Sequence, residues 1–243
     1  MAPPAPDPIV TTREQILARI AANLRRTRAV TTTTSHAHRV PARAVAETGG
    51  PAVSRLDRFA FELEALGGFV HRASSDAEAV RLLLDLCTTH RASRVLAWDE
   101  RFVGLPGLRA GLSEHRIGYD TGWLPPEDPA RKDRLAALEK ISIGVTGASG
   151  AIADSGTLAL VSGPGRSRLA SLLPPVHVAV LDAGRIHASL ADLLAARPSI
   201  ADEGSNLVLI SGPSRTADIE MTLTRGVHGP GEVHVIITGA SGC

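Results

Sequence analysis

The chain has 243 residues, of which 44% are hydrophobic and 21% charged, and its formal net charge is +1. This length can bury a sizeable core, and the apolar fraction excludes a disordered chain. The near-zero net charge gives no reason to expect nucleic acid as a partner. The two cysteines, Cys87 and Cys243, are too few for a disulfide framework or for the four thiolates of an ordinary iron–sulfur cluster.

The first residues carry no targeting signal. Met1 to Val10 is rich in proline and lacks the apolar segment of a signal peptide. No stretch approaches the roughly 18 apolar residues that a membrane helix requires. We therefore expect a cytoplasmic protein without a membrane span.

Residues 1–50 differ from the rest of the chain, because they hold seven arginines against three acidic residues. A helix is expected from about Thr12 to Arg28, since apolar residues recur there every four positions. Residues 31–51 have no apolar period and predict a flexible linker. This basic arm could contact an acidic partner or nucleic acid, or equally the acidic surface of its own or a sister subunit. The predicted domains are thus 1–50, a helix and basic linker, and 51–243, the body.

In the body, predicted helices and strands alternate. Helices are expected at 56–66, from Ser75 through Cys87, and at 129–140, 168–173 and 190–196, with a short one from Ala217; strands are expected at 69–71, 95–98, 141–146, 156–162, 176–181, 207–210 and 233–238. The segment between Trp98 and Ile117 looks irregular. Several strands are continuously apolar, which favours an α/β fold with a mostly parallel sheet and helices on both faces.

Common motifs of nucleotide and metal chemistry are missing. Gly163-Pro-Gly165 and Gly229-Pro-Gly231 both lack the third glycine of a dinucleotide-binding loop, and neither lysine follows a glycine as in a phosphate-binding loop. No paired-cysteine or H-E-x-x-H zinc pattern occurs, and His36 and His38 have no third ligand nearby. We expect no metal site and no cofactor bound by this chain.

The first segment that could bind a ligand contains Asp154, Ser155, Gly156 and Thr157, among other small residues. Such a segment lets the backbone approach a ligand and offers hydroxyl and amide donors to an anion. The alternative is a tight hairpin connection in which Asp154-Ser155-Gly156 only makes the turn.

The second segment is Ser211 to Glu220, which follows an apolar strand and is expected to open a helix. At the carboxyl end of a parallel strand, Ser211, Gly212, Ser214, Arg215, Thr216 and Asp218 could hold a carboxylate or phosphate. Ser214 or Thr216 could equally be a helix cap, with Asp218 and Glu220 complementing the helix dipole. Downstream, His228 lies in a glycine–proline loop, where it could be a general base, a substrate donor or a structural residue.

Four pieces of sequence resemble the LUD-domain family, most closely its lactate utilization protein C branch. They are Ala153-Asp-Ser-Gly-Thr157, Ser171-Leu-Leu-Pro-Pro-Val-His177, Ser211 to Glu220, and Gly226-Val-His-Gly-Pro230, in that order. Arg13 to Ile20 is similar to the opening helix of that branch. One departure is Asp154-Ser155, where the family commonly has Glu-Thr.

The resemblance implies a fold similar to the sugar-phosphate isomerase and CoA-transferase group, and a role in oxidising L-lactate to pyruvate beside two iron–sulfur partner proteins. It assigns no catalytic residue; Asp154, Glu220 and His228 are the weak candidates. Our hypothesis is a non-redox subunit or accessory protein that binds a small carboxylate, such as lactate or pyruvate, at the two loops. The alternatives are a stand-alone isomerase or acyl-CoA transferase, and a regulatory or structural binding module.

Overall fold

The computed structural model describes residues 54–217, 223–225 and 229–239, and near the N-terminus positions 13, 15, 17–19, 21 and 22. The chain divides into two compact units, Met1–Ala46 and Glu47–Cys243. In the first unit the described positions are all helical, in agreement with the predicted helix. The predicted linker lies outside the described residues.

The second unit is built around a six-stranded sheet in which every pair of neighbours is parallel. Its strands, in spatial order, are β1 (Phe69–Arg72), β12 (Glu232–Thr238), β7 (Val176–Asp182), β4 (Ile143–Gly147), β2 (Arg94–Ala97) and β3 (Gly118–Asp120). The central strands are buried almost throughout, as their continuous apolar sequences predict for a sheet that is covered on both faces.

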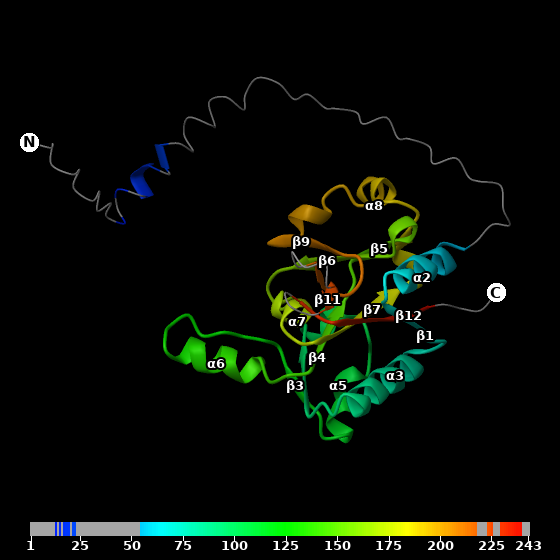
Figure 1. The fold of residues 1–243 in the computed structure, drawn as a ribbon, viewed down its shortest axis with the longest axis horizontal. Helices are drawn as coiled ribbons and strands as arrows, with labels where there is room; N and C mark the ends of the chain where they lie inside the picture. The colour runs from blue at the N-terminus through cyan, green and yellow to red at the C-terminus, as the bar shows by residue number, and fades with distance from the viewer. Residues whose placement is uncertain are drawn as a thin grey trace, which may run out of the picture. The chain divides into compact units, whose positions relative to one another are not determined.

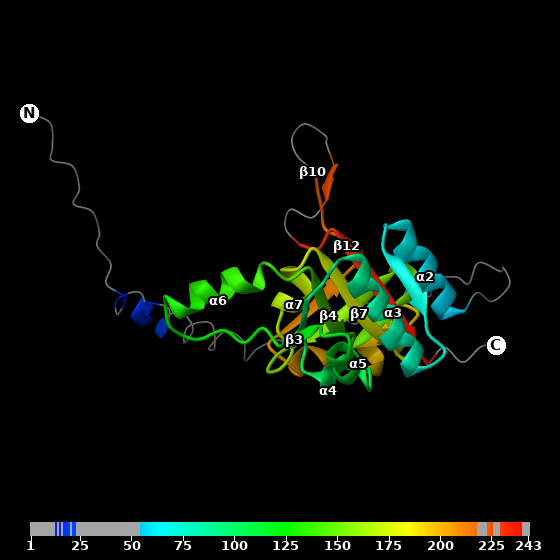
Figure 2. The ribbon, with the colours of Figure 1, turned by 90° about the horizontal axis from the view of Figure 1, so that it is seen from below.

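Seven helices accompany the strands of this unit among the described residues (Figures 1 and 2). They are α2 (Arg55–Ala65), α3 (Asp76–Thr89), α4 (Glu100–Val103), α5 (Leu108–Glu114), α6 (Ala130–Leu138), α7 (Leu169–Leu172) and α8 (Leu190–Ala196). Ser75 caps α3 by accepting a hydrogen bond from the Glu78 backbone amide, as its position in the sequence predicts. Among the described residues, no helix is long and apolar enough to cross a membrane.

Two glycines of β4 bring helices onto opposite faces of the parallel sheet. A Cβ atom on Gly144 would lie 1.8 Å from the carbonyl oxygen of Ala170 in α7, and one on Gly147 would lie 2.1 Å from that of Phe102 in α4. Positions three apart in a strand face opposite sides. The sheet therefore carries helices on both faces, and the predicted α/β class is confirmed.

A second sheet has the order β8 (Ile186–His187), β5 (Gly150–Ile152), β6 (Thr157–Ser162) and β9 (Asn206–Ile210). It is mostly antiparallel, with only β5 and β8 parallel. Residues 153–155 and Gly156, with φ of 58°, connect β5 to β6, so the hairpin interpretation of this segment is confirmed. Helix α8 lies beside this sheet (Figure 1), and a small separate core, which includes Ile152, Val161 and Leu193, joins the two.

Three expectations about local structure are wrong. The strand that precedes Ser211 belongs to the antiparallel sheet, not the parallel one. Arg215–Ala217 is a strand, β10, that pairs with Leu223–Arg225, β11, so no helix starts at Ala217. Pairing with a segment downstream overrode the local signals of a helix cap. The segment after Trp98 contains α4 and α5, which are too short to show a helical period.

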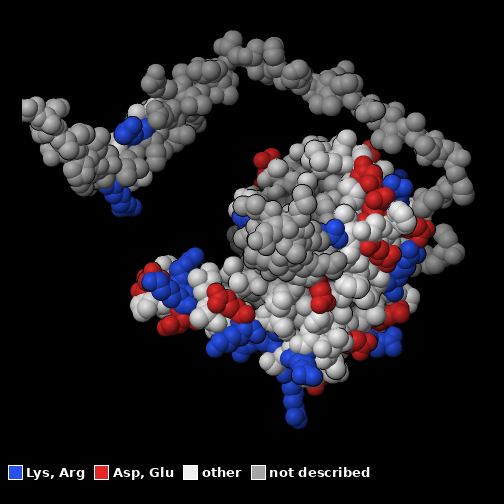
Figure 3. Space-filling model, in the orientation of Figure 1, with Lys and Arg blue, Asp and Glu red and all other residues white. Residues whose placement is uncertain are grey.

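The described surface of the second unit mixes both signs of charge. On the face drawn in Figure 3, acidic and basic side chains are interspersed, in keeping with the near-neutral net charge. Most of the buried apolar side chains form one large cluster that includes residues of all strands of the parallel sheet except β1 and β3. This core fixes the strand ends on which the candidate site is built.

Candidate functional site

The two segments singled out in the sequence meet at one point. The hydroxyl oxygens of Thr157 and Ser211 lie 2.7 Å apart, and the Thr157 hydroxyl also donates to the Ser155 hydroxyl at 2.9 Å. The antiparallel pairing of β6 with β9 places Leu158 opposite Ile210, which brings the two flanking hydroxyl groups together. The hydroxyl groups that could bind a ligand are therefore hydrogen-bonded to one another.

This meeting point is packed against the end of α2. A Cβ atom on Gly156 would lie 2.3 Å from the backbone nitrogen of Leu63, and one on Gly212 would lie 3.1 Å from the Cβ of Leu66. The Arg215 guanidinium donates a hydrogen bond to the Leu66 carbonyl. The small residues of both segments thus let α2 lie close to the second sheet.

Gly229 and Pro230, at the end of the glycine–proline loop that holds His228, also join this region. The Ser214 backbone amide donates to the carbonyl of Pro230 at 2.8 Å, and Gly229 lies against the Ser214 side chain. Asp154 is exposed in the turn before β6. Asp218, Glu220 and His228 lie outside the described residues, and for Thr216 the structure describes only the backbone, which pairs with Thr224.

A pocket of about 340 Å³ opens elsewhere, at the carboxyl ends of the parallel strands. Trp98 follows β2, Ala148 and Ser149 follow β4, Asp182 ends β7, and Thr238 ends β12. Parallel α/β sheets bind ligands at this edge because the loops that leave the strands surround a crevice there. The volume is at the lower end of the range for small-molecule sites, which suits a small ligand.

The charge of the pocket is mainly basic. Its lining includes Arg101, Arg166, Arg185 and Arg197 against the two acidic residues Asp182 and Glu203. The carboxylate of Glu203 forms an ion pair with Arg197, and that of Asp182 accepts the Gly184 backbone amide at 2.8 Å. Arg101 is paired with Asp99 at 3.4 Å, so Arg166 and Arg185 are the two arginines of the lining that are left against Asp182.

Arg166 is held in place from two sides. Its Nη2 donates to the Glu203 carbonyl at 2.7 Å, and its guanidinium carbon lies 4.9 Å from the centre of the Phe102 ring. Its Nε atom is buried and has no hydrogen-bond partner among the described residues. A buried donor without a partner costs free energy unless a ligand satisfies it. Guanidinium groups bind carboxylates and phosphates through paired hydrogen bonds, so the pocket is suited to a small anion.

None of these arginines was a candidate from the sequence. Gly163-Pro-Gly165 was weighed only as an incomplete dinucleotide motif, although it makes the turn before Arg166. The pocket could have been predicted from the residues at the carboxyl ends of the apolar strands, such as Trp98, Ser149 and Asp182. The arginines come from four separate segments, so no sequence motif unites them.

Comparison with known proteins gives one family and one fold. The family model of the LUD domain matches residues 56–238. Lactate utilization protein C of Shouchella clausii is 33% identical over 142 residues, which cover 57% of this chain and 59% of that protein. Lactate utilization protein C of Halalkalibacterium halodurans is 33% identical over 146 residues, covering 58% and 60%. The match thus spans about three fifths of the length of each relative.

A solved structure is similar to the second unit. The crystal structure of a DUF162 family protein from Deinococcus radiodurans matches with a TM-score of 0.55 and 22% identity, covering 77% of this chain and 99% of that one. At this level of identity the match supports the fold alone.

Proposed function

Because the chain belongs to the LUD-domain family, we propose that it serves in the utilization of lactate, as a non-redox component that binds a small carboxylate such as lactate or pyruvate. The family relatives named for lactate utilization support the process. The arginine-lined pocket at the carboxyl ends of the parallel strands supports the ligand class, and it is the observation that carries the proposal.

The pocket chemistry fits a 2-hydroxy or 2-oxo acid. Arg166 offers a fixed guanidinium, and the exposed Arg185 adds a second positive charge. Ser149 lines the same pocket and supplies a hydroxyl for the second polar group of the ligand. The Thr157–Ser211 region remains the second place where such a carboxylate would bind, and the same titration tests it.

Electrons would have to leave through other proteins. Cys87 is buried, and burial raises the pKa of its thiol to about 11, so it is a protonated thiol near neutral pH. The two cysteines of the chain are too few to hold an ordinary iron–sulfur cluster, so the iron–sulfur partner proteins that the family resemblance implies would carry the electrons. This component would then bind or position substrate in a cytoplasmic complex.

The binding test uses the full chain titrated with L-lactate and with pyruvate by calorimetry. Arg185→Gln and Arg166→Gln should each weaken binding by about 10- to 100-fold, because a hydrogen bond to a charged group contributes about 1.5–3 kcal/mol. Arg131→Gln is the matched control, since Arg131 is exposed on α6 and does not line the pocket. If Ser214→Ala with Thr216→Ala abolished binding and the arginine variants did not, the carboxylate would sit at the loops instead.

The role in lactate oxidation is tested by tagged capture from the native cells. The captured material should contain acid-labile sulfide and reduce an artificial acceptor when L-lactate is added. A captured chain that holds no sulfide and stays inactive would favour the isomerase or transferase alternative.

A further inference from the structure

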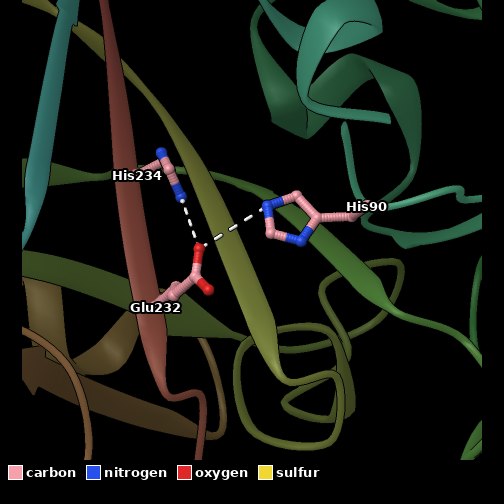
Figure 4. A group of neighbouring side chains, drawn as sticks. All are labelled: His90, Glu232 and His234. Atoms are coloured by element: carbon pink, nitrogen blue, oxygen red, sulfur yellow. Dashed lines mark hydrogen bonds and ion pairs between the residues drawn. The ribbon is translucent and has the colours of Figure 1, made fainter. Parts of the chain in front are cut away.

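A cluster of three side chains lies at the amino-terminal end of β12, whereas the pocket lies at the carboxyl end of this strand. Glu232 and His234 are the first and third residues of β12, so both side chains point to the same face of the sheet. His90 follows the last residue of α3, which packs on that face. Figure 4 shows the three side chains turned toward one another.

The distances within the cluster match those between ligands of one metal ion. The Oε2 atom of Glu232 lies 3.3 Å from Nε2 of His234 and 3.5 Å from Nε2 of His90, and all three ligand atoms lie within 4.8 Å of one another. Ligands of a tetrahedral zinc ion lie about 3.3 Å apart, because each is about 2.0 Å from the metal. The third distance, between the ligand atoms of His90 and His234, is at most 4.8 Å, so metal binding would draw the partly exposed His90 side chain closer to His234.

The His234 ring is oriented by its neighbours. Its Nδ1 lies 3.0 Å from Nε2 of His71, and its ring stacks on Phe69 with 4.6 Å between the ring centres. A hydrogen bond from Nδ1 to His71 leaves the lone pair of His234 Nε2 facing Glu232 and His90. Metal-binding histidines are commonly held by such a bond from the other ring nitrogen.

We propose that His90, Glu232 and His234 bind one divalent transition-metal ion of the zinc type. Two histidines and one carboxylate form a donor set that zinc takes in proteins with the fourth position open. Here the Glu232 and His90 side chains are 45% and 21% exposed, so that position faces solvent. The sequence predicted no metal site, because His90 is far from Glu232 in the chain and the two meet only through the packing of α3 on β12.

The site is separate from the proposed carboxylate pocket. Glu232 begins β12, whereas Thr238, which lines the pocket, ends it. At about 3.3 Å per residue the two ends lie about 20 Å apart. The two proposals can therefore be tested independently. The protein could bind the carboxylate without binding a metal ion at this cluster, and it could bind the metal ion without binding the carboxylate.

The test is a titration of the full-length, chelator-treated protein with Zn²⁺ by calorimetry, and with Co²⁺ by visible absorption. We expect one strong site per chain and the intense visible bands of a four-coordinate cobalt ion. His90→Gln and Glu232→Gln should each weaken zinc binding at least 100-fold and abolish the cobalt bands. Zinc should raise the thermal midpoint of the original protein and not of these variants.

His115→Gln is the matched control, because His115 also follows the last residue of a helix, α5, but lies outside the cluster. It should bind zinc as the original protein does. The proposal is overturned if the chain binds no stoichiometric zinc. It is equally overturned if His90→Gln and Glu232→Gln bind zinc unchanged, since the ion would then be held by other histidines, such as His36 and His38.

Discussion

His177 is a fully buried histidine in the middle of the parallel sheet. Its Nε2 lies 2.9 Å from the hydroxyl of Thr146 on the neighbouring strand, and its Nδ1 has no hydrogen-bond partner among the described residues. Burial, with a smaller contribution from His234, lowers the pKa of His177 to about 4. A charged imidazole at this position would be removed from water without an acidic partner, so the folded protein keeps the ring neutral.

This residue should make stability depend on pH. Between about pH 6.5 and pH 4 the unfolded chain binds a proton at His177 and the folded chain does not. The free energy of unfolding should therefore fall as the pH drops through this range, by up to about 3 kcal/mol from this group.

Urea unfolding at a series of pH values measures the effect against His177→Gln, which keeps an amide for Thr146 but cannot titrate. The variant should show a shallower pH dependence, because His71 and His234 still contribute to it in the same direction. Parallel curves for the two proteins would contradict the prediction.

At the scale of elements, the turn between β5 and β6 depends on one glycine. Gly156 has a left-handed backbone and lies under the backbone of α2 at Leu63. A side chain here would be strained and would also push α2 away from the turn. The small residues of this segment thus serve the packing of α2, whatever they do for a ligand.

Gly156→Ala should lower the free energy of unfolding by about 2–4 kcal/mol, from backbone strain together with the steric clash. Gly104→Ala separates the two causes, because Gly104 is also left-handed, with φ of 73°, but has no atoms near its missing Cβ. Gly104→Ala should lower the free energy of unfolding by only about 1–2 kcal/mol. Equal losses in chemical denaturation would show that α2 does not press on Gly156.

The elements with a strong local signal could be predicted from the sequence. The cap at Ser75, the continuously apolar β7 and the turn at Gly156 each follow from residues close together in the chain. The strand at Arg215–Ala217 could not be predicted, because its partner, Leu223–Arg225, lies further along the chain and supplies the stabilising hydrogen bonds. Small and polar residues signal a loop equally well whether it binds a ligand or packs against a helix.

The candidate site was less predictable than the fold. The meeting of Thr157 with Ser211 depends on the register of β6 and β9, which a single sequence does not reveal. The pocket combines arginines from four separate segments of the chain, and charge near a strand end is common on any protein surface. The two proposed sites became visible only when the strand order was known.

At the scale of the whole molecule, the LUD domain can be separated from the basic arm. The family match begins at residue 56, and the second compact unit begins at residue 47. The large buried core belongs to the second unit and holds residues of both the six-stranded and the four-stranded sheet. This unit should therefore fold without the preceding residues.

A chain that starts at Ser54 should keep its thermal midpoint within about 3 °C of the full chain, since a loss of about 1 kcal/mol corresponds to that shift. It should also bind the carboxylate with unchanged affinity. Calorimetric scanning and the lactate titration measure both. Partner capture that disappears in this shortened chain would identify the arginine-rich arm as the contact surface, and a large drop in the midpoint would show that the arm is part of the core.

The position of β12 has a consequence for the order in which the protein assembles. Among the described strands β1 pairs only with β12, so residues 69–72 join the sheet through residues 232–238. During synthesis β1 leaves the ribosome long before its partner, and it must wait, with α2 and α3, until residues 232–238 have emerged. Closing so long a loop is slow. Folding of this domain therefore cannot be completed before β12 is available, and a chain that stops short of β12 should expose the edge of β7 to aggregation or to chaperones.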